Sequence, residues 1–279
     1  MERGPVGVIG QGYVGSSYAD YFESEDRAVV RYSLDPAHAD AKEKIRECRV
    51  VLVAVPTPTR DGACDTSALE QALSLIGSGS FVLIKSTVPP GTTARLQSAF
   101  PELLLFHSPE FLSEATAAHD ARNPFITILG MGVENAAYEA AAQELAELLP
   151  AAPRTLVCTS GEAELCKYAH NTSGYFQVVF FNLLYDFAAA HGMSWERIQS
   201  MIEADPFMAG RYANPLHGGG RGAGGRCFVK DFEAFLSAYR TKVDDPSGIS
   251  VLTAVRDKNI ELLRGSGKSV DLVADVYGA

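Results

Sequence analysis

A glycine pattern near the N-terminus constrains the fold of this chain more than any other feature of its sequence. The pattern, G-x-G-x-x-G, directly follows a short apolar run, Val6–Ile9, and precedes a stretch with helical character, residues 16–24. A second apolar run, residues 28–34, ends at Asp35, which lies 20 residues after the last glycine. A strand, a glycine turn, a helix, a strand and an acidic residue in this order are typical of a dinucleotide-binding α/β domain.

The residues of the pattern predict how such a ligand is held. The first glycine closes the tight turn, the second lets a pyrophosphate approach the backbone, and the third lets helix and strand pack together. The N–H groups at the start of the helix face the phosphates. Asp35 is expected to bind the ribose 2′-hydroxyl and to repel a 2′-phosphate, which favours NAD over NADP; a strand–helix turn without a ligand is the alternative. The expected cofactor-binding residues here are Gly10, Gly12, Tyr13, Val14, Gly15 and Asp35.

The rest of the N-terminal half continues the alternation of strands and helices, which predicts a doubly wound, mostly parallel sheet. Helical stretches such as 67–76 and 134–149 lie between several apolar runs of strand length, which are residues 50–55, 81–84, 103–106, 125–129 and 155–157. From about Gly161 the sequence is typical of helix, apart from a glycine-rich loop. We therefore predict an α/β Rossmann domain over residues 1–160, followed over residues 161–279 by a long central helix and an all-helical domain.

Composition excludes several classes of function. A net charge of −10 argues against non-specific binding of nucleic acid, which requires a basic surface. The five cysteines lack the spacing of a disulfide framework or a zinc site, so no metal is expected and a reducing cytosol is the expected compartment. No signal peptide is recognisable. Polar residues interrupt the longest apolar stretch, 174–192, which predicts a buried helix rather than a membrane span.

The glycine-rich loop presents a cysteine near the end of the chain. Residues 218–225 contain six glycines, and Cys227 follows shortly before Lys230 and Asp231. Glycines let the backbone approach a ligand closely, and a cysteine beside a lysine can act as a nucleophile in its thiolate form. A small buried apolar side chain is the alternative for Cys227. The other cysteines have no such setting and are expected to be structural: Cys48, Cys64, Cys158 and Cys166.

Three polar pairs share a spacing of four residues, which on a helix places both side chains on one face. The pairs are Glu110 with Glu114, Lys167 with Asn171, and Cys227 with Asp231. Each pair could present two polar groups to one cleft. A solvated helix face is the alternative for the two glutamates, and a surface position is the alternative for Lys167.

Six ordered motifs along nearly the whole chain resemble those of the UDP-glucose/GDP-mannose dehydrogenases. They are residues 10–15; 55–58 with 61, 62 and 65; 85–92; 108–114; 163–168 with 171; and 224–231. Members of that family oxidise the primary alcohol of a sugar nucleotide to a carboxylate with two NAD+. The resemblance therefore implies an enzyme of the UDP-glucose 6-dehydrogenase type, with a nucleotide-sugar substrate, acting in polysaccharide biosynthesis.

The resemblance also implies a role for individual residues. Cys227 would attack the aldehyde made by the first hydride transfer, and a second transfer would turn the thiohemiacetal into a thioester. Lys167 and Asn171 would stabilise the oxyanion, and Glu110 would be the general base for hydrolysis. Water and protons would be positioned by Thr87 and Asp231. Further NAD contacts are implied for Pro56, Thr57, Pro58, Ser86, Glu114 and Lys230, and substrate contacts for Phe111, Leu112, Tyr212, Asn214, Gly224 and Arg221.

The chain departs from the family pattern in places that affect these expectations. The sequence ends at Ala279, whereas the family continues into a third, C-terminal nucleotide-binding domain, so we expect a short form or a fragment. Asp40 stands where a basic residue is common, which predicts weaker NAD binding. His217, Arg221 and Arg226 are expected to form a small anion site that takes over part of the diphosphate binding. A flexible, solvated loop is the alternative for that segment.

Three hypotheses on function are compared. An active minimal dehydrogenase is favoured by the intact catalytic set. A catalytically impaired or partner-dependent NAD-binding homologue is the alternative, because the third domain is missing. A two-electron alcohol dehydrogenase of the β-hydroxyacid type is disfavoured by the Cys227 loop.

The helix expected over residues 162–191 is apolar on most faces. The corresponding helix forms the dimer core in the family that the chain resembles, so we expect a homodimer. Neither nucleic-acid nor membrane partners are expected.

Overall fold

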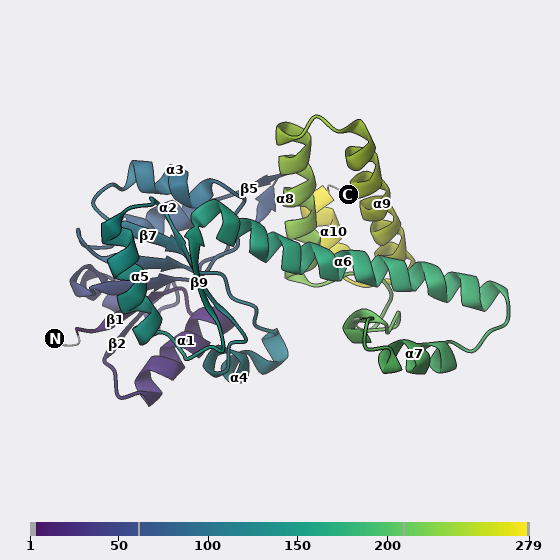
Figure 1. Cartoon of the computed structure of the whole chain (residues 1–279), viewed down its shortest axis with the longest axis horizontal. Helices are drawn as coiled ribbons and strands as arrows, with labels where there is room; N and C mark the ends of the chain where they lie inside the picture. The colour runs from purple at the N-terminus through teal and green to yellow at the C-terminus, as the bar shows by residue number, and fades with distance from the viewer. Residues whose placement is uncertain (1–3, 61, 209, 278–279) are drawn as a thin grey trace. The chain divides into compact units, whose positions relative to one another are not determined.

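The chain folds into two compact units, seen in a computed structural model that describes residues 4–60, 62–208 and 210–277 (Figure 1). The sheet unit contains the residues up to 58 together with residues 65–167. The helical unit contains Thr59–Cys64 together with the residues from 168 onward. The chain therefore passes between the units at 58/59, at 64/65 and at 167/168.

A seven-stranded sheet forms the centre of the sheet unit, and it confirms the predicted Rossmann-like α/β architecture (Figure 1). The strand order is β2-β1-β3-β6-β7-β8-β9, and every neighbouring pair is parallel except β7 with β8. Each strand coincides with a predicted apolar run, with its ends shifted by at most two residues. The strands are β1 (Val6–Ile9), β2 (Val29–Tyr32), β3 (Val50–Val53), β6 (Phe81–Ile84), β7 (Leu104–His107), β8 (Thr127–Met131) and β9 (Thr155–Thr159).

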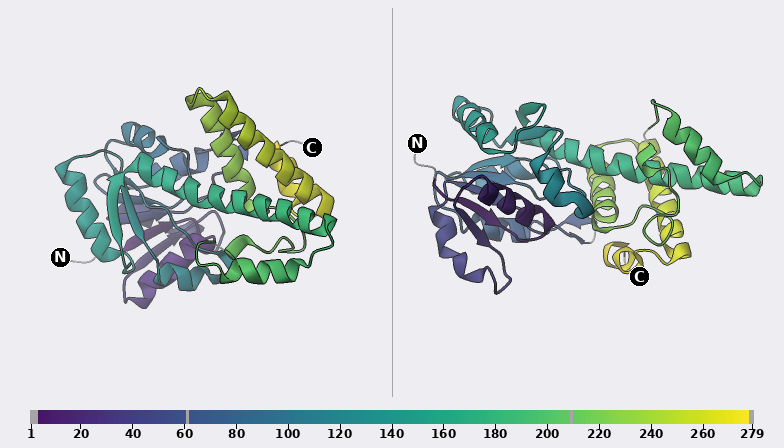
Figure 2. Two further views of the ribbon diagram at one scale, coloured as in Figure 1. Left: turned by 45° about the vertical axis from the view of Figure 1, so that its right-hand side comes forward. Right: turned by 90° about the horizontal axis from the view of Figure 1, so that it is seen from below.

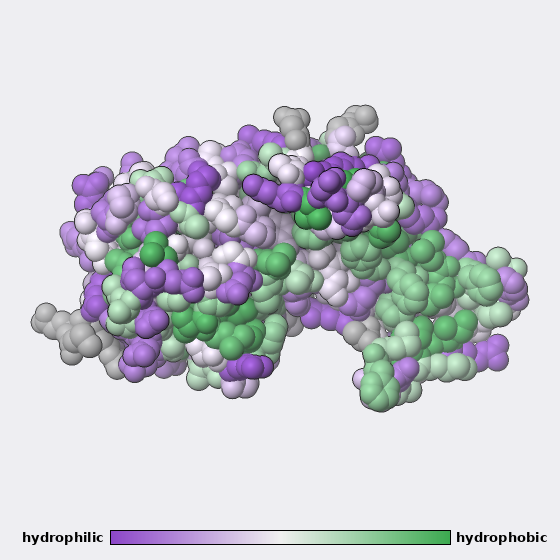
Figure 3. Space-filling view, turned by 45° about the horizontal axis from the view of Figure 1, so that its top comes forward, coloured by the Kyte–Doolittle hydropathy of each residue, from purple (hydrophilic) through white to green (hydrophobic). Residues whose placement is uncertain are grey.

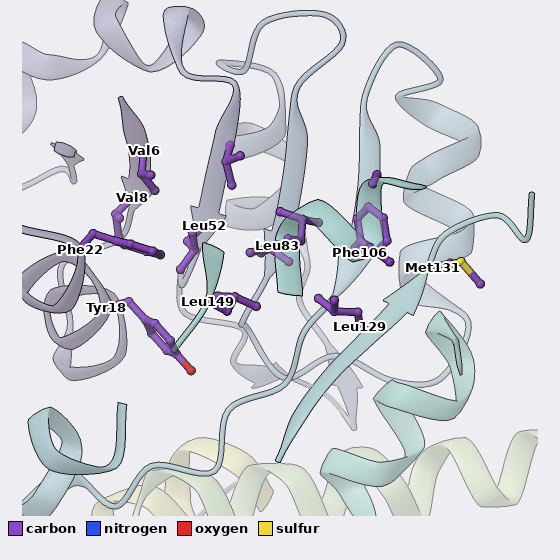
Figure 4. Packing of buried hydrophobic residues seen from close by; sticks show 14 of the residues in the cluster. Val6, Val8, Tyr18, Phe22, Leu52, Leu83, Phe106, Leu129, Met131 and Leu149 are labelled. Carbon is purple, nitrogen blue, oxygen red and sulfur yellow. The ribbon is translucent and has the colours of Figure 1, made fainter. Parts of the chain in front are cut away.

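Helices cover both faces of this sheet and close two separate apolar cores. On one face, Tyr18 and Phe22 of α1 (Tyr13–Ser24) pack with β1 and β3 (Figure 4), and α5 (Ala136–Leu148) completes the cluster. On the other face lie α2 (Ser67–Leu73) and α3 (Thr92–Ala99). Successive strand side chains point to opposite faces, so a run in which every residue is buried, such as β3, serves both cores. Shorter elements complete the unit: η1 (Ala39–Ala41), η2 (Glu43–Glu47), η3 (Glu114–Thr116) and α4 (Ala117–Arg122).

The turn between β1 and α1 needs its glycines for different reasons. Gly10 has a φ of +91°, and a side chain at this position would collide with the backbone of Ala54. A side chain on Gly15 would collide with the carbonyl oxygen of Gly10. Gly12, the N-cap of α1, has no atom within 4 Å of the place that a Cβ would take. Since Gly12 is the N-cap, the first residue of the helix is Tyr13, three residues before the predicted start.

The helical unit is built around α6, α8 (Arg226–Lys242) and α9 (Pro246–Ser266), which lie together in both views of Figure 2. α6 (Ser160–Ala190) is one helix of 31 residues and confirms the predicted long central helix. Its apolar contacts with α8 include Tyr175 and Phe232, whose stacked ring centroids are 3.9 Å apart. None of the described helices is long and apolar enough to cross a lipid bilayer. The remaining elements are α7 (Trp195–Ala204), η4 (Gly210–Tyr212) and α10 (Val270–Tyr277).

A short hairpin from the N-terminal half belongs to the helical unit, which the sequence pattern did not predict. β4 (Thr59–Arg60) pairs with β5 (Ala63–Cys64) in antiparallel orientation. Thr59 Oγ1 donates a hydrogen bond of 2.9 Å to the carbonyl oxygen of Lys230 on α8. α6 also extends across the division, since its residues 160–167 belong to the sheet unit. The boundary expected at 160/161 lies in the first turn of this helix.

Two glycines of the β1–α1 turn provide a matched test. Gly15→Ala should lower the free energy of unfolding by about 2–3 kcal/mol, because the new methyl group meets backbone that has to move. Gly12→Ala should lower that free energy by no more than about 1 kcal/mol, the usual effect of alanine at an N-cap, and should weaken NAD binding about tenfold, because the methyl group occupies space that a pyrophosphate needs. Urea unfolding and calorimetric titration with NAD+ measure both effects. Equal destabilisation by the two substitutions would contradict this account of the turn.

Candidate functional site

Four parallel strands of the sheet unit end in one row, which brings several predicted site residues to the same edge. The last residues of β1, β3, β6 and β7 are in register across the sheet. The segments that follow are the glycine turn, residues 54–58, residues 85–87 and residues 108–110. β1 lies between β2 and β3, so the direction of winding changes there. Ligands of open α/β sheets bind outside the carboxyl ends of the strands at such a point.

The β1–α1 turn fits a dinucleotide. Gly12 gives α1 no side-chain cap, so the N–H groups of the first helical turn can face phosphate oxygens. The open space at Gly12 allows a ligand to approach the backbone closely. Asp35 follows β2 and is exposed, and its Oδ1 accepts a hydrogen bond of 2.9 Å from the backbone N of Ala37. An acidic group is thus fixed where a ribose hydroxyl is expected.

Two residues that were predicted to contact NAD fasten neighbouring loops at this edge. Ser86 Oγ accepts a hydrogen bond of 3.0 Å from the backbone N of Val55 and donates one of 2.8 Å to its carbonyl oxygen. Thr57 Oγ1 donates a hydrogen bond of 2.7 Å to the carbonyl oxygen of Thr87. Both hydroxyl side chains are buried. Their hydrogen bonds hold the segment after β3 against the segment after β6. Contact of Ser86, of Thr57 and of the prolines on either side of Thr57 with NAD stays a prediction.

Glu110 and Lys167 form a buried ion pair in the sheet unit. Lys167 Nζ lies 3.2 Å from Glu110 Oε1, while Glu110 Oε2 accepts a hydrogen bond of 2.7 Å from the backbone N of Leu112. Glu110 is 6% exposed and Lys167 is 4% exposed. The Lys167 ammonium also lies 5.5 Å from the centre of the Phe111 ring. The surface interpretation of Lys167 is therefore wrong, and each Glu110 oxygen has a fixed partner.

Glu110 and Glu114 do not share a helix face. Residues 108–113 form a loop without regular structure after β7. Glu110 is buried in this loop, whereas Glu114 is exposed at the start of η3. Because residues 110–113 are not helical, the spacing of four residues does not act as a helical turn. The paired-helix interpretation is wrong here, and a contact of Glu114 with NAD stays a prediction.

Glu164 joins the start of α6 to the start of α3. Its Oε1 accepts a hydrogen bond of 2.7 Å from the backbone N of Thr93, and its Oε2 accepts one of 2.6 Å from that of Gly91. Burial raises the pKa of Glu164, although these hydrogen bonds oppose the change. The N-cap Gly91 supplies no side-chain cap, so Glu164 provides one for α3. Lys167, one turn further along α6, is thereby fixed beside Glu110.

A second buried lysine lies in the sheet unit. Lys85 Nζ donates a hydrogen bond of 2.9 Å to Ser108 Oγ and lies 4.5 Å from the centre of the Tyr18 ring. Burial lowers the pKa of Lys85 to about 7, although the carboxylate of Glu110 opposes this. Lys85, Tyr18 and Ser108 line a small pocket, together with Pro109, Pro124, Ile126, Thr127, Leu149 and Pro150.

His107 is the buried neighbour of this group. Burial, followed by the charges of Lys85 and Lys167, lowers the pKa of His107 to about 3, so its imidazole is neutral at pH 7. Neither ring nitrogen has a hydrogen-bond partner among the described residues. Lys85, His107 and Glu164 were not among the predicted site residues. For Lys85 the signal was a charged residue directly after the apolar run 81–84.

Asp231 is the centre of a polar cluster in the helical unit. Asn171 Nδ2 on α6 donates a hydrogen bond of 2.6 Å to Asp231 Oδ2, and Lys230 Nζ forms an ion pair with Asp231 Oδ1. Asn171 and Asp231 are both buried. Burial lowers the pKa of Lys230, but the carboxylate of Asp231 and the thiols of Cys227 and Cys64 together raise it more, so the net change is upward.

Cys227 is the second residue of α8 and is exposed. Asp231 lies four residues further along the same helix, as the spacing predicted, but it is buried. A helix N-terminus favours negative charge, and Lys230 is one turn away on α8. The buried, apolar interpretation of this cysteine is wrong, because its side chain is exposed.

The predicted substrate contacts lie in both units. Phe111 packs against Phe125 in the sheet unit, with ring centroids 5.1 Å apart. Tyr212 in the helical unit meets Phe228 edge-on at 5.7 Å. The exposed Asn214 accepts a hydrogen bond of 3.1 Å at Oδ1 from the backbone N of Leu216. The contacts of these residues with substrate stay predictions.

Arg221 binds side chains of α6. Its Nε donates a hydrogen bond of 2.8 Å to Asn182 Oδ1, and a terminal nitrogen lies 2.7 Å from Asp186 Oδ1. Its guanidinium also lies 5.0 Å from the centre of the Tyr185 ring. Of the other two residues in the expected anion site, His217 is exposed and the side chain of Arg226 lies outside the described part of the chain. The charge of Arg221 is thus already paired with a carboxylate of α6.

Comparison with known proteins gives matches along most of the chain. Residues 35–149 match the model of the UDP-glucose/GDP-mannose dehydrogenase family, NAD binding domain, and residues 161–261 match that of its central domain. The UDP-glucose 6-dehydrogenase AglM of Haloferax volcanii is 28% identical, with 93% of this chain and 72% of that protein covered. The putative UDP-glucose 6-dehydrogenase YtcA of Bacillus subtilis is 29% identical, with 84% and 56% covered.

A solved structure agrees with these matches. The UDP-glucose dehydrogenase from the hyperthermophilic archaeon Pyrobaculum islandicum superimposes with a TM-score of 0.78 at 27% identity, covering 95% of this chain and 71% of that one. The chain spans 56–72% of the length of the two curated relatives. The matched NAD-binding domain confirms NAD as the predicted cofactor.

The buried lysine predicts a pH-dependent stability. The pKa of Lys85 is about 7 in the folded protein and about 10.4 in an unfolded chain. Between these values the unfolded chain binds more protons, so the free energy of unfolding should rise with pH by up to about 1.4 kcal/mol per pH unit. Lys85→Met should remove this rise, whereas Lys42→Met, at an exposed position, should keep it. Urea unfolding from pH 7 to about pH 10 measures the slopes; parallel curves for wild type and Lys85→Met would refute the assignment.

Proposed function

We propose a function that follows from one fact: this chain belongs to the UDP-glucose/GDP-mannose dehydrogenase family, and is therefore an NAD-dependent nucleotide-sugar dehydrogenase. The proposed substrate is a sugar nucleotide of the UDP-glucose type, because the relatives named above act on UDP-glucose. The proposed product is the uronic acid, made by two successive oxidations of the primary alcohol. We place this activity in the cytosol and in the supply of polysaccharide precursors.

The cofactor is held by the glycine turn of the sheet unit. The N–H groups at the start of α1 bind the pyrophosphate, Gly12 leaves room for it, and Asp35 binds the ribose. When bound there, NAD+ would supply the hydride acceptor, one molecule for each of the two oxidations. Glu114, Lys230 and the turn at residues 55–58 are proposed to contact the cofactor as well.

Cys227 carries the covalent part of the proposed reaction. After the alcohol has lost a hydride and a proton, the thiolate adds to the aldehyde carbon, and the oxygen takes up a proton to give a thiohemiacetal. Loss of a second hydride and of the hydroxyl proton gives a thioester. Water then attacks the carbonyl carbon, the carbon–sulfur bond breaks, and the carboxylate and the Cys227 thiol are released.

The polar residues around the reaction have distinct proposed roles. Lys167 and Asn171 stabilise negative charge on the substrate oxygen. Glu110 removes the proton from the hydrolytic water, and its pairing with Lys167 at 3.2 Å orients it for this role. Asp231 and Thr87 position water and protons. The family match carries the proposal, and the buried side chains of Glu110, Lys167, Asn171 and Asp231 supply polar groups of the kinds that its chemistry requires.

The number of NADH molecules formed per substrate tests the proposal. With UDP-glucose or a related sugar nucleotide, wild type should form two NADH and one uronic acid. Cys227→Ala should lose the second oxidation and lower the rate of acid formation by about 10³-fold or more. Cys166→Ala, which removes another exposed thiol, is the control and should behave as wild type. Absorbance at the NADH band and mass spectrometry of the product measure both quantities.

Each other result has a definite meaning. One NADH per substrate from wild type would support a simple two-electron alcohol dehydrogenase. No NADH with any sugar nucleotide, despite measurable NAD binding, would support the catalytically impaired or partner-dependent homologue. Full acid formation by Cys227→Ala would refute the nucleophile.

We also propose a homodimer formed through α6. Three large apolar side chains on the C-terminal half of this helix are substantially exposed: Phe180 (49%), Leu183 (49%) and Phe187 (60%). Figure 3 shows hydrophobic residues gathered over this part of α6 and over α7. An exposed apolar patch of this kind is typical of a protein–protein interface. The corresponding helix forms the dimer core in the family that the chain resembles.

A charge on this face should prevent association. Phe187→Glu should convert a dimeric wild-type chain into a monomer, because an interface that buries an unpaired carboxylate loses several kcal/mol. Val133→Glu, at an exposed apolar position of the sheet unit, is the matched control and should stay dimeric. Light scattering coupled to size-exclusion chromatography at micromolar concentration measures the mass. A monomeric wild-type chain would refute the proposed dimer.

A further inference from the structure

The glycine-rich loop ahead of Cys227 is held along one side by the end of α9 and the residues that follow it. We propose that Asn259 is a positioning residue for Cys227, acting with Ser266 and Ser269 through the backbone of this loop. The role of Cys227 as nucleophile, which Asn259 would support, rests on the function proposed above. All of these residues belong to the helical unit.

Asn259 makes two hydrogen bonds to a single residue of the loop. Its Oδ1 accepts a hydrogen bond of 2.6 Å from the backbone N of Ala223, and its Nδ2 donates one of 3.0 Å to the carbonyl oxygen of Ala223. Both residues are buried. The amide thus satisfies a buried N–H and a buried C=O at once, which no apolar side chain could do.

Three further side chains extend this attachment along the loop. Together with Asn259 they bond the backbone of every residue from 221 to 225 except Gly224. The contacts are from Arg221 N to Ser266 Oγ at 2.9 Å, from Lys268 Nζ to the carbonyl oxygen of Gly222 at 2.9 Å, and from Gly225 N to Ser269 Oγ at 3.3 Å. Residues 259–269 therefore fix the course of the loop backbone.

The glycines of the loop allow this close approach. A side chain on Gly220 would meet Ser266, one on Gly222 would meet Asn259, and one on Gly224 would meet Ser269. Gly222 also has a φ of +89°. At these three positions the protein's own side chains occupy the space that a Cβ would need. The glycines are therefore explained without a ligand. Gly218 and Gly219, both with positive φ, instead form the turn between the bridged residues His217 and Gly220.

The attachment ends where α8 begins. Gly225 is the N-cap of α8 and gives it no side-chain cap, so the first turn depends on contacts from outside the helix to resist fraying. Ser269 bonds the backbone N of Gly225, and Asn259 fixes Ala223 two residues earlier. Ser269 has a φ of +51°, a conformation that non-glycine residues rarely adopt and that persists where surrounding contacts impose it. Cys227 lies in this first turn, so the direction of its Cα–Cβ bond follows from the attachment.

Asn259→Ala and Ser266→Ala test the proposal, and Thr253→Ala is the matched control. Thr253 is a half-buried polar residue of α9, and its hydroxyl group donates a hydrogen bond to the carbonyl oxygen of Ile249 and accepts one from Arg240. Asn259→Ala leaves both backbone groups of Ala223 without their side-chain partner. Ser266→Ala is the milder change and carries the test if Asn259→Ala does not fold. Thermal unfolding of each variant establishes whether it is folded.

The first measurement needs no substrate. Mass spectrometry of the intact, folded protein after timed exposure to iodoacetamide gives the alkylation rate of Cys227, with Cys166 as an internal reference. The rate at Cys227 should fall by about threefold or more in both variants, because a disordered first turn favours the thiolate less, and it should be unchanged in Thr253→Ala. A smaller decrease, or an increase, in a folded variant would overturn the positioning role. This result is independent of whether wild type oxidises any sugar nucleotide.

The second measurement separates positioning from a general loss of structure. Only the second oxidation needs Cys227, so the variants should form between one and two NADH per substrate and release aldehyde that hydroxylamine can trap, while the first oxidation proceeds at close to the wild-type rate. Equal slowing of both oxidations, with two NADH still formed per substrate, would overturn the proposal. Failure of wild type itself to form NADH would count against the proposed function and would leave the alkylation result to decide on the positioning role.

Discussion

The polar residues on the inner side of α6 can be buried only because each has a partner of complementary chemistry. Glu164 accepts hydrogen bonds from the start of α3, Lys167 pairs with Glu110, and Asn171 donates to Asp231. Their positions, three and four residues apart, form one stripe along the helix. An unpaired charge in such a place costs several kcal/mol. The partners therefore fix the rotation of α6 about its own axis, and with it the positions of the residues proposed to bind substrate oxygen.

Much of the fold follows from periodicity, and the site follows from periodicity only in part. Uninterrupted apolar runs such as 50–53 and 81–84 predict buried strands because a strand covered on both faces needs apolar groups on both. Lys167 and Asn171, four residues apart, lie on one face of a helix because α6 is continuous through both positions. The same spacing does not place Glu110 and Glu114 on one helix face, because residues 108–113 form a loop without regular structure. Spacing alone could not distinguish the two cases.

What sequence could not provide were the partners of polar groups. Ser86 and Thr57 were predicted as ligand contacts, and each proves to hold a neighbouring loop by a hydrogen bond to its backbone. Asn259, on α9, shows no sequence pattern that indicates its two hydrogen bonds to Ala223. The glycines before Cys227 indicated close approach, but a glycine does not reveal which atoms approach it. Such contacts join residues far apart in the chain, and only the folded arrangement brings them together.

The hairpin β4–β5 has a consequence for how this protein is made and divided. Residues 59–64 belong to the helical unit although they are synthesised before most of the sheet unit, and residues 160–167 complete the sheet unit although they begin a helix of the other. Neither unit is therefore a contiguous piece of the chain. On the ribosome the hairpin emerges long before α8, against which it packs, and it must wait for that helix to be made. A gene cut at residue 160 would give two fragments, each carrying a part of the other's structure, so recombination between relatives would have to exchange both segments together.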